Sequence, residues 1–70
     1  MKKYYNVYKI NKETLDLENV FGSENTKEIA NYLQINYKHI TMYSTNSLEK
    51  APKQEKIINN EHYIIIYEND

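Results

Sequence analysis

The stretch TKEIANYLQINYKHITMYS, Thr26 to Ser44, carries an apolar rhythm that breaks once and then resumes. Its first half places apolar residues at spacings of one, three and four between Ile29 and Leu33, as on one face of an amphipathic helix. This pattern predicts a helix from about Thr26 to Leu33 and, after a short turn, a second helix from about Tyr37 to Ser44. Two short helices this close together indicate a helix-turn-helix.

Both predicted helices have start signals in the sequence. Asn25 stands before the first helix and Glu28 follows three residues later, as in a capping box. Asn36 can cap the second helix in the same way. Gln34 occupies the turn position where glycine is commonest, so we expect it to adopt a left-handed backbone.

Strand-like segments lie on both sides of this stretch. KYYNVYKI, Lys3 to Ile10, and LDLENVF, Leu15 to Phe21, are joined by a short polar turn and predict an antiparallel hairpin. EHYIIIYE, Glu61 to Glu68, predicts a strand covered on both faces or a central one, and we expect it to pair with the N-terminal strand. KIINN, Lys56 to Asn60, could add a short partner strand with its two asparagines as the turn.

These segments predict one α+β domain over residues 1–70. The expected architecture is a small antiparallel sheet of two to three strands with a helix-turn-helix packed on one face, in the order β-β-α-α-β. The helix-turn-helix covers about residues 26–44. A polar loop with the only proline, Pro52, covers about residues 45–56.

The composition of the chain argues against several classes of function. Nine lysines face ten carboxylates, arginine and cysteine are absent, and the net charge is −1. Without cysteine there is neither a disulfide nor a thiolate metal site, and no catalytic arrangement or phosphate-binding glycine loop stands out. No apolar run approaches the length of a membrane span. We expect a cytoplasmic protein that is not an enzyme, has no cofactor or metal, and does not bind membranes.

The order of a YxVY strand, a minimal motif of the form KEIAxxLxIxxxxIxxY and the C-terminal strand HYIIIYE covers most of the chain. This order resembles small helix-turn-helix proteins of phages and mobile elements in low-GC Gram-positive bacteria. The resemblance implies a DNA-binding accessory or regulatory protein, for example in transcription regulation, that works in the cytoplasm of a bacterial host. Gln34 in the turn and the lack of arginine depart from what is usual in DNA-binding proteins.

If the motif binds double-stranded DNA, the outer residues of the second helix enter the groove. Lys38 would contact guanine or a phosphate, Thr41 a thymine methyl, and Asn36 a phosphate or an adenine edge. Lys27 on the first helix would hold the backbone. The predicted nucleic-acid-binding residues are Lys27, Asn36, Tyr37, Lys38, Thr41 and Met42; His39 shares their surface, and Lys50, Lys53 and Lys56 in the loop are further candidate phosphate contacts.

The same residues are also compatible with other roles. Asn36 could serve only as a cap, Tyr37 could pack in the interior, and the lysines could simply be solvated. The eight tyrosines could stack on single strands, although sheet packing explains them better. The alternative function is a protein-interaction module that binds and inhibits a host protein, such as a defence nuclease or a polymerase, without DNA. A third is a structural scaffold in a larger complex.

A module this small offers few base contacts, so we expect a homodimer, formed through an exposed edge of the tyrosine-rich strand. The position of the lysines separates the two main functions. DNA binding needs Lys27, Lys38 and the loop lysines on one face, whereas an interaction module would mix them with Glu24, Glu28 and Glu49.

Overall fold

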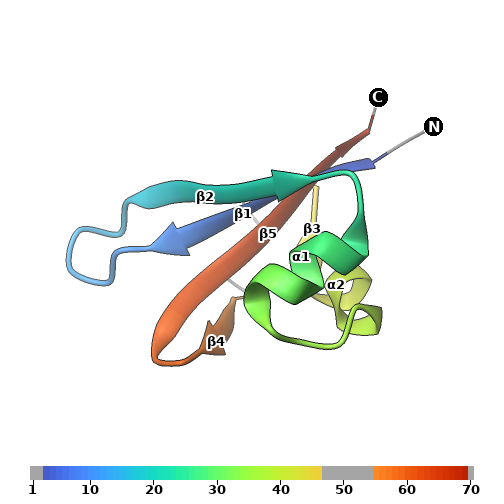
Figure 1. The fold of residues 1–70 in the computed structure, drawn as a ribbon. Coiled ribbons are helices and arrows are strands. Elements are labelled where there is room, and N and C mark those ends of the chain that lie inside the picture. The colour runs from blue at the N-terminus through green and yellow to red at the C-terminus, as the bar shows by residue number, and fades with distance from the viewer. Residues whose placement is uncertain (1–2, 47–54, 70) are drawn as a thin grey trace.

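The computed structural model describes residues 3–46 and 55–69. In these residues the elements follow one another as β1 (Lys3–Ile10), β2 (Leu17–Ser23), α1 (Thr26–Leu33), α2 (Lys38–Tyr43), β3 (Ser44–Thr45), β4 (Lys56–Ile58) and β5 (Glu61–Asn69). The strands form one five-stranded sheet, and the two helices lie together against one of its faces (Figure 1).

The tyrosine-rich strand β1 lies inside the sheet. It pairs antiparallel with β2 on one side and with β5 on the other, which confirms the predicted hairpin and the predicted pairing of the first and last strands. The register joins Lys3 to Asn69, so the two ends of the described chain lie side by side (Figure 1). The expected dimer edge on β1 is therefore wrong, because both edges of β1 are paired; β2 is one of the strands at the edges of the sheet.

The predicted fold class is wrong about the sheet. Instead of two to three antiparallel strands in the order β-β-α-α-β, there are five strands in the order β-β-α-α-β-β-β. Two short strands account for the difference: β4 pairs antiparallel with the first part of β5, and β3 pairs parallel with a later part, with Ser44 opposite Ile65. The sheet is therefore mixed. A strand of two polar residues has no alternation to detect, which is why the sequence did not indicate β3.

Local turn chemistry sets the two hairpins. Asn59 and Asn60 both have positive φ, 51° and 67°, as the two-residue turn between β4 and β5 requires, and asparagine tolerates this conformation. In the turn after β1, the Asn11 side chain accepts hydrogen bonds from the backbone of Glu13 and Thr14. Leu15 also has positive φ, 65°, so β2 begins at Leu17 rather than at Leu15 as predicted.

The main core lies between the helices and the sheet. Val7, Ile29 and Ile40 are fully buried, and Ile65 of β5 is 1% exposed. The remaining buried members of this core are Tyr5, Ala30 and Leu33. Because Ile40 is the buried residue of α2, it fixes which side of that helix faces the protein.

The predicted polar loop differs from the structure at its two ends. Thr45 belongs to β3 and Lys56 to β4. The other loop lysines, Lys50 and Lys53, and Pro52 lie outside the described residues.

Candidate nucleic-acid interface

The first turn of α1 is held by the caps that the sequence indicated. The Asn25 side-chain oxygen accepts a hydrogen bond from the Lys27 backbone N–H at 2.8 Å. The Ser23 hydroxyl donates to the Glu28 carboxylate at 2.8 Å and accepts from the Asn25 N–H at 3.0 Å. Ser23 therefore stands between the two partners of the predicted capping box. These bonds fix the start of the helix and with it the position of Lys27.

The turn between the helices also follows the prediction. Gln34 has φ 59° and ψ 43°, the left-handed conformation, and the Ile35 N–H returns to the Ala30 carbonyl at 3.0 Å. The Asn36 side-chain oxygen accepts from the Lys38 N–H at 3.0 Å, and its carbonyl accepts from the His39 N–H at 2.9 Å. Asn36 is thus the side-chain cap of α2, and the oxygen that would accept a hydrogen bond from an adenine edge is already engaged.

The outer side of α2 is open. Met42 is 68% exposed and Tyr37 is 47% exposed, and Lys38 and Thr41 are also exposed. At about 100° of rotation per residue, Lys38 and Met42 point almost directly away from the buried Ile40. Thr41 lies next to them, so these three predicted contact residues form one outward face.

Two lysines from other elements lie against tyrosines of this region. Lys27 Nζ is 5.7 Å from the centre of the Tyr37 ring. Lys56 Nζ, from β4, is 4.6 Å from the centre of the Tyr43 ring and 3.4 Å from its hydroxyl. Both ring distances are within the range of about 6 Å over which a cation is attracted to an aromatic face. Such a contact holds the lysine without neutralising its charge.

The predicted residues fall into two groups. Lys27, Asn36 and Tyr37 meet at a shallow groove of about 370 Å³ where α1 approaches the start of α2, and Ala30, Asn31 and Ile35 complete its lining. Lys38, Thr41 and Met42 instead share the outward face of α2. Lys56, which the sequence placed in a loop, is brought to α2 by the β4–β5 hairpin. Only the Asn59–Asn60 turn signal indicated that hairpin.

The stretch of chain that contains α2 carries no negatively charged side chain. No aspartate or glutamate occurs between Ile29 and Asn46, and Lys38 is the lysine of this stretch. Lys27 and Lys56 approach the tyrosines at the two ends of α2 from other elements. The carboxylates next to them in sequence, Glu28 and Glu55, are engaged by Ser23 and by Lys12.

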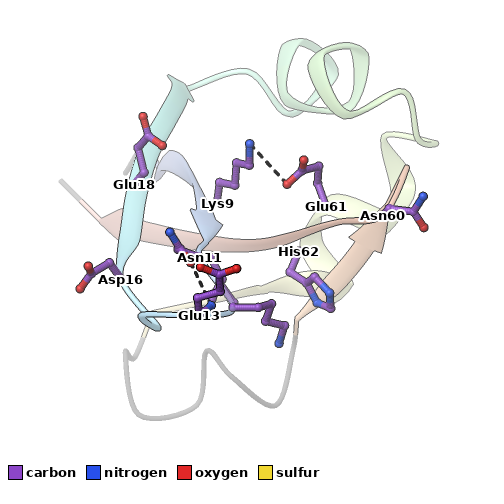
Figure 2. Close-up of a pocket in the computed structure, with 10 residues that line it drawn as sticks. Lys9, Asn11, Glu13, Asp16, Glu18, Asn60, Glu61 and His62 are labelled. Atoms are coloured by element: carbon purple, nitrogen blue, oxygen red, sulfur yellow. Dashed lines mark hydrogen bonds and ion pairs between the residues drawn. The ribbon is translucent and has the colours of Figure 1, made fainter.

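Carboxylates gather at the turn end of the sheet, in a cleft of about 570 Å³. Four carboxylates (Glu13, Asp16, Glu18 and Glu61) and two lysines (Lys9 and Lys12) are among its lining residues (Figure 2). Lys9 Nζ lies 3.3 Å from the Glu61 carboxylate, and Lys12 Nζ lies 2.8 Å from that of Glu55. Here the lysines are paired with carboxylates.

Glu55 joins three parts of this end of the molecule. Its carboxylate binds Lys12 of the first turn and contacts His62 of β5. The hydrogen bond from Lys12 lowers the pKa of the Glu55 carboxyl below its ordinary value. The hydrogen bond from His62 and the charges of both partners act in the same direction, and partial burial acts against them.

Within residues 3–46 and 55–69, no three histidine or carboxylate side chains are grouped as a metal ion would require. Over the same residues, no helix has the length and apolar character needed to cross a membrane. No protein-family model, curated protein or solved structure matches the chain.

Proposed function

We propose that this protein is a small double-stranded DNA-binding module and that α2 is the element that enters the groove. The single observation that carries the proposal is the surface of α2. Its outward residues are exposed, no carboxylate occurs from Ile29 to Asn46, and three lysines border or belong to the helix. DNA presents a dense array of negative phosphates, so a surface of this charge is attracted to it despite the net charge of the whole protein.

Each residue has a separate role in this proposal. Lys38 contacts a phosphate or the acceptor edge of guanine, and Thr41 and Met42 supply apolar contacts, for example to the methyl group of thymine. Lys27 holds the backbone. Asn36 acts as the cap that presents α2, because its side-chain oxygen already accepts the Lys38 N–H. Tyr37 acts mainly through the position it gives Lys27.

The resemblance to phage and mobile-element proteins supports an accessory or regulatory role in the cytoplasm of a bacterial host. The proposal includes no catalytic step and no cofactor. A homodimer would double the few base contacts that one α2 can make. In the described part of the chain β2 pairs only with β1, so its other edge replaces that of β1 as the proposed site of strand pairing.

The test is binding of a pool of random duplex DNA at two salt concentrations by the wild type and by matched lysine variants. We expect salt-sensitive binding, because phosphate contacts release counterions. Lys38→Ala should weaken it. Lys9→Ala should bind as the wild type does, because Lys9 is already paired with the Glu61 carboxylate. A folded wild type that binds no duplex at low salt contradicts the proposal.

One observation favours the interaction module as a second candidate. Tyr32, Tyr37 and Met42 are large side chains with 43%, 47% and 68% of their surface exposed, and tyrosine and methionine are enriched in protein interfaces. The ring of Tyr32 stacks on that of Phe21 with 4.6 Å between centres, so part of this surface is rigid. Absence of DNA binding, combined with capture of a specific host protein that Met42→Ala and Tyr32→Ala both abolish, would favour this second function.

A further inference from the structure

The two lysine–tyrosine pairs beside α2 come from opposite parts of the chain. Lys27 belongs to α1 and contacts Tyr37 just before α2 begins. Lys56 belongs to β4 and contacts Tyr43, the last residue of α2. The His39 ring also meets Tyr43 edge-on, with 5.8 Å between centres, and Tyr43 packs against the core, so its ring has contacts besides Lys56.

Helix geometry places these two pairs on different flanks of α2. Tyr37 and Tyr43 are six residues apart, which leaves about 120° between them on one side of the axis and about 240° on the other. Ile40 is midway on the narrow side and is fully buried. The wide side holds Lys38, Thr41 and Met42. Each tyrosine therefore lies where α2 meets the rest of the protein, one on each border of the outward face.

A helix that lies in a groove of DNA has one phosphate backbone on each side. When α2 lies along the major groove with Lys38, Thr41 and Met42 toward the bases, its two flanks face the two backbones. A lysine on each flank then faces a different strand. We propose that Lys27 and Lys56 contact phosphates on the two opposite strands that border the groove occupied by α2. This inference rests on the proposed DNA-binding function.

The tyrosines give these lysines a specific role. A free lysine side chain loses rotamer freedom worth about 1.5–2 kcal/mol when it is fixed. Lys27 and Lys56 already lie against aromatic rings before DNA arrives, so part of that ordering is in place. The ring keeps the ammonium charged and available, unlike the carboxylates that pair with Lys9 and Lys12. Tyr37 and Tyr43 are therefore positioning residues for the two phosphate contacts.

The first experiment measures log K against log salt for a random duplex pool. Lys27→Ala and Lys56→Ala should each flatten the slope by about 0.9, and the double variant by about twice that, because each phosphate contact releases its own counterions. Lys56→Arg keeps the positive charge and should keep the slope. This variant shows whether the flatter slope of Lys56→Ala comes from the lost charge or from a change in folding. Lys9→Ala is the control with an unchanged slope.

The second experiment distinguishes lysine contacts to both DNA strands from contacts to a single strand. A duplex in which one strand has a neutral methylphosphonate backbone still offers the protein one charged strand, in either orientation. If the two lysines contact opposite strands, only one of them can meet a charged phosphate there, so the Lys27→Ala, Lys56→Ala double variant should flatten the wild-type slope on this duplex by one contact. If both contact the same strand, the double variant should flatten it by two contacts.

The outcomes distinguish the two levels of the proposal. If Lys56→Ala keeps the wild-type slope while Lys38→Ala or Lys27→Ala flattens it, the inference is wrong and DNA binding through α2 stands. A loss of two contacts in the double variant on the half-neutral duplex also overturns the inference alone. If the folded wild type binds no duplex at low salt, the proposed function fails and this inference fails with it.

Discussion

Two sets of lysines in this molecule have different partners. Lys27 and Lys56 lie against tyrosine rings at α2, and no carboxylate occurs from Ile29 to Asn46. Lys9 pairs with Glu61 at the cleft (Figure 2), and Lys12 pairs with Glu55. An aromatic ring leaves the charge of a lysine available, whereas a carboxylate offsets it. The net charge of −1 therefore does not say which lysines could attract a polyanion, because that depends on the partner of each one.

The largest expected effect comes from removing the side chain that holds α2 on the protein. Ile40 is fully buried between the helices and the sheet, so Ile40→Ala should lower the free energy of unfolding by about 2–5 kcal/mol through lost burial and a cavity. That is a large fraction of the stability of a small domain, about 5–15 kcal/mol. Urea unfolding would measure it.

Met42→Ala is the matched control on the same helix. Met42 is 68% exposed, so its loss should change the free energy of unfolding by no more than about 0.5 kcal/mol. Equal destabilisation by the two variants would mean that α2 is not anchored through Ile40.

A substitution in the turn before α2 should raise the free energy of unfolding, by a smaller amount. Gln34 has φ 59°, which costs a residue with a side chain about 1–2 kcal/mol. Gln34→Gly removes that cost but adds freedom to the unfolded chain, so a net gain of about 0.5–1 kcal/mol is expected. Thermal unfolding should show a rise in Tm of about 2–8 °C. Gln34→Ala keeps a Cβ and should give no comparable gain; a fall in Tm with glycine would show that the Gln34 side chain has another function.

The smallest expected effect on the free energy of unfolding comes from Glu55, which pairs with Lys12. The folded-state pKa of Glu55 is lowered, chiefly by Lys12. Its contribution to stability is therefore present above the ordinary glutamate pKa, about 4.3, and is lost as the pH falls through the lowered value. Because Lys12 is half exposed, Glu55→Gln should cost no more than about 1 kcal/mol at neutral pH.

The measurement is the free energy of unfolding against pH for Glu55→Gln and for Glu13→Gln, which removes a carboxylate that lines the cleft. The loss of stability below about pH 4.3 should be shallower in Glu55→Gln than in the wild type. Glu13→Gln should follow the wild type. The same pH dependence in all three proteins would show that the Lys12–Glu55–His62 contacts contribute nothing to folding.

The sequence by itself determined the features that depend on neighbouring residues. The helix Thr26–Leu33 has the predicted bounds, Asn25 and Asn36 act as caps, and Gln34 is left-handed. The Asn59–Asn60 turn also has the predicted conformation. Caps, turns and apolar periodicity arise from contacts within a few residues, so their signals are contained in short windows of sequence.

Only the tertiary structure decided the number of strands and the distribution of charge. β3 exists because α2, held by Ile40, delivers Ser44 beside Ile65 of β5. Lys56 reaches Tyr43, and Glu55 reaches Lys12, across long separations in sequence. Such contacts depend on how the elements pack. The sequence of a lysine and its neighbours does not show whether its side chain contacts an aromatic ring or a carboxylate. The surface that we propose for DNA is for that reason visible only in the folded chain.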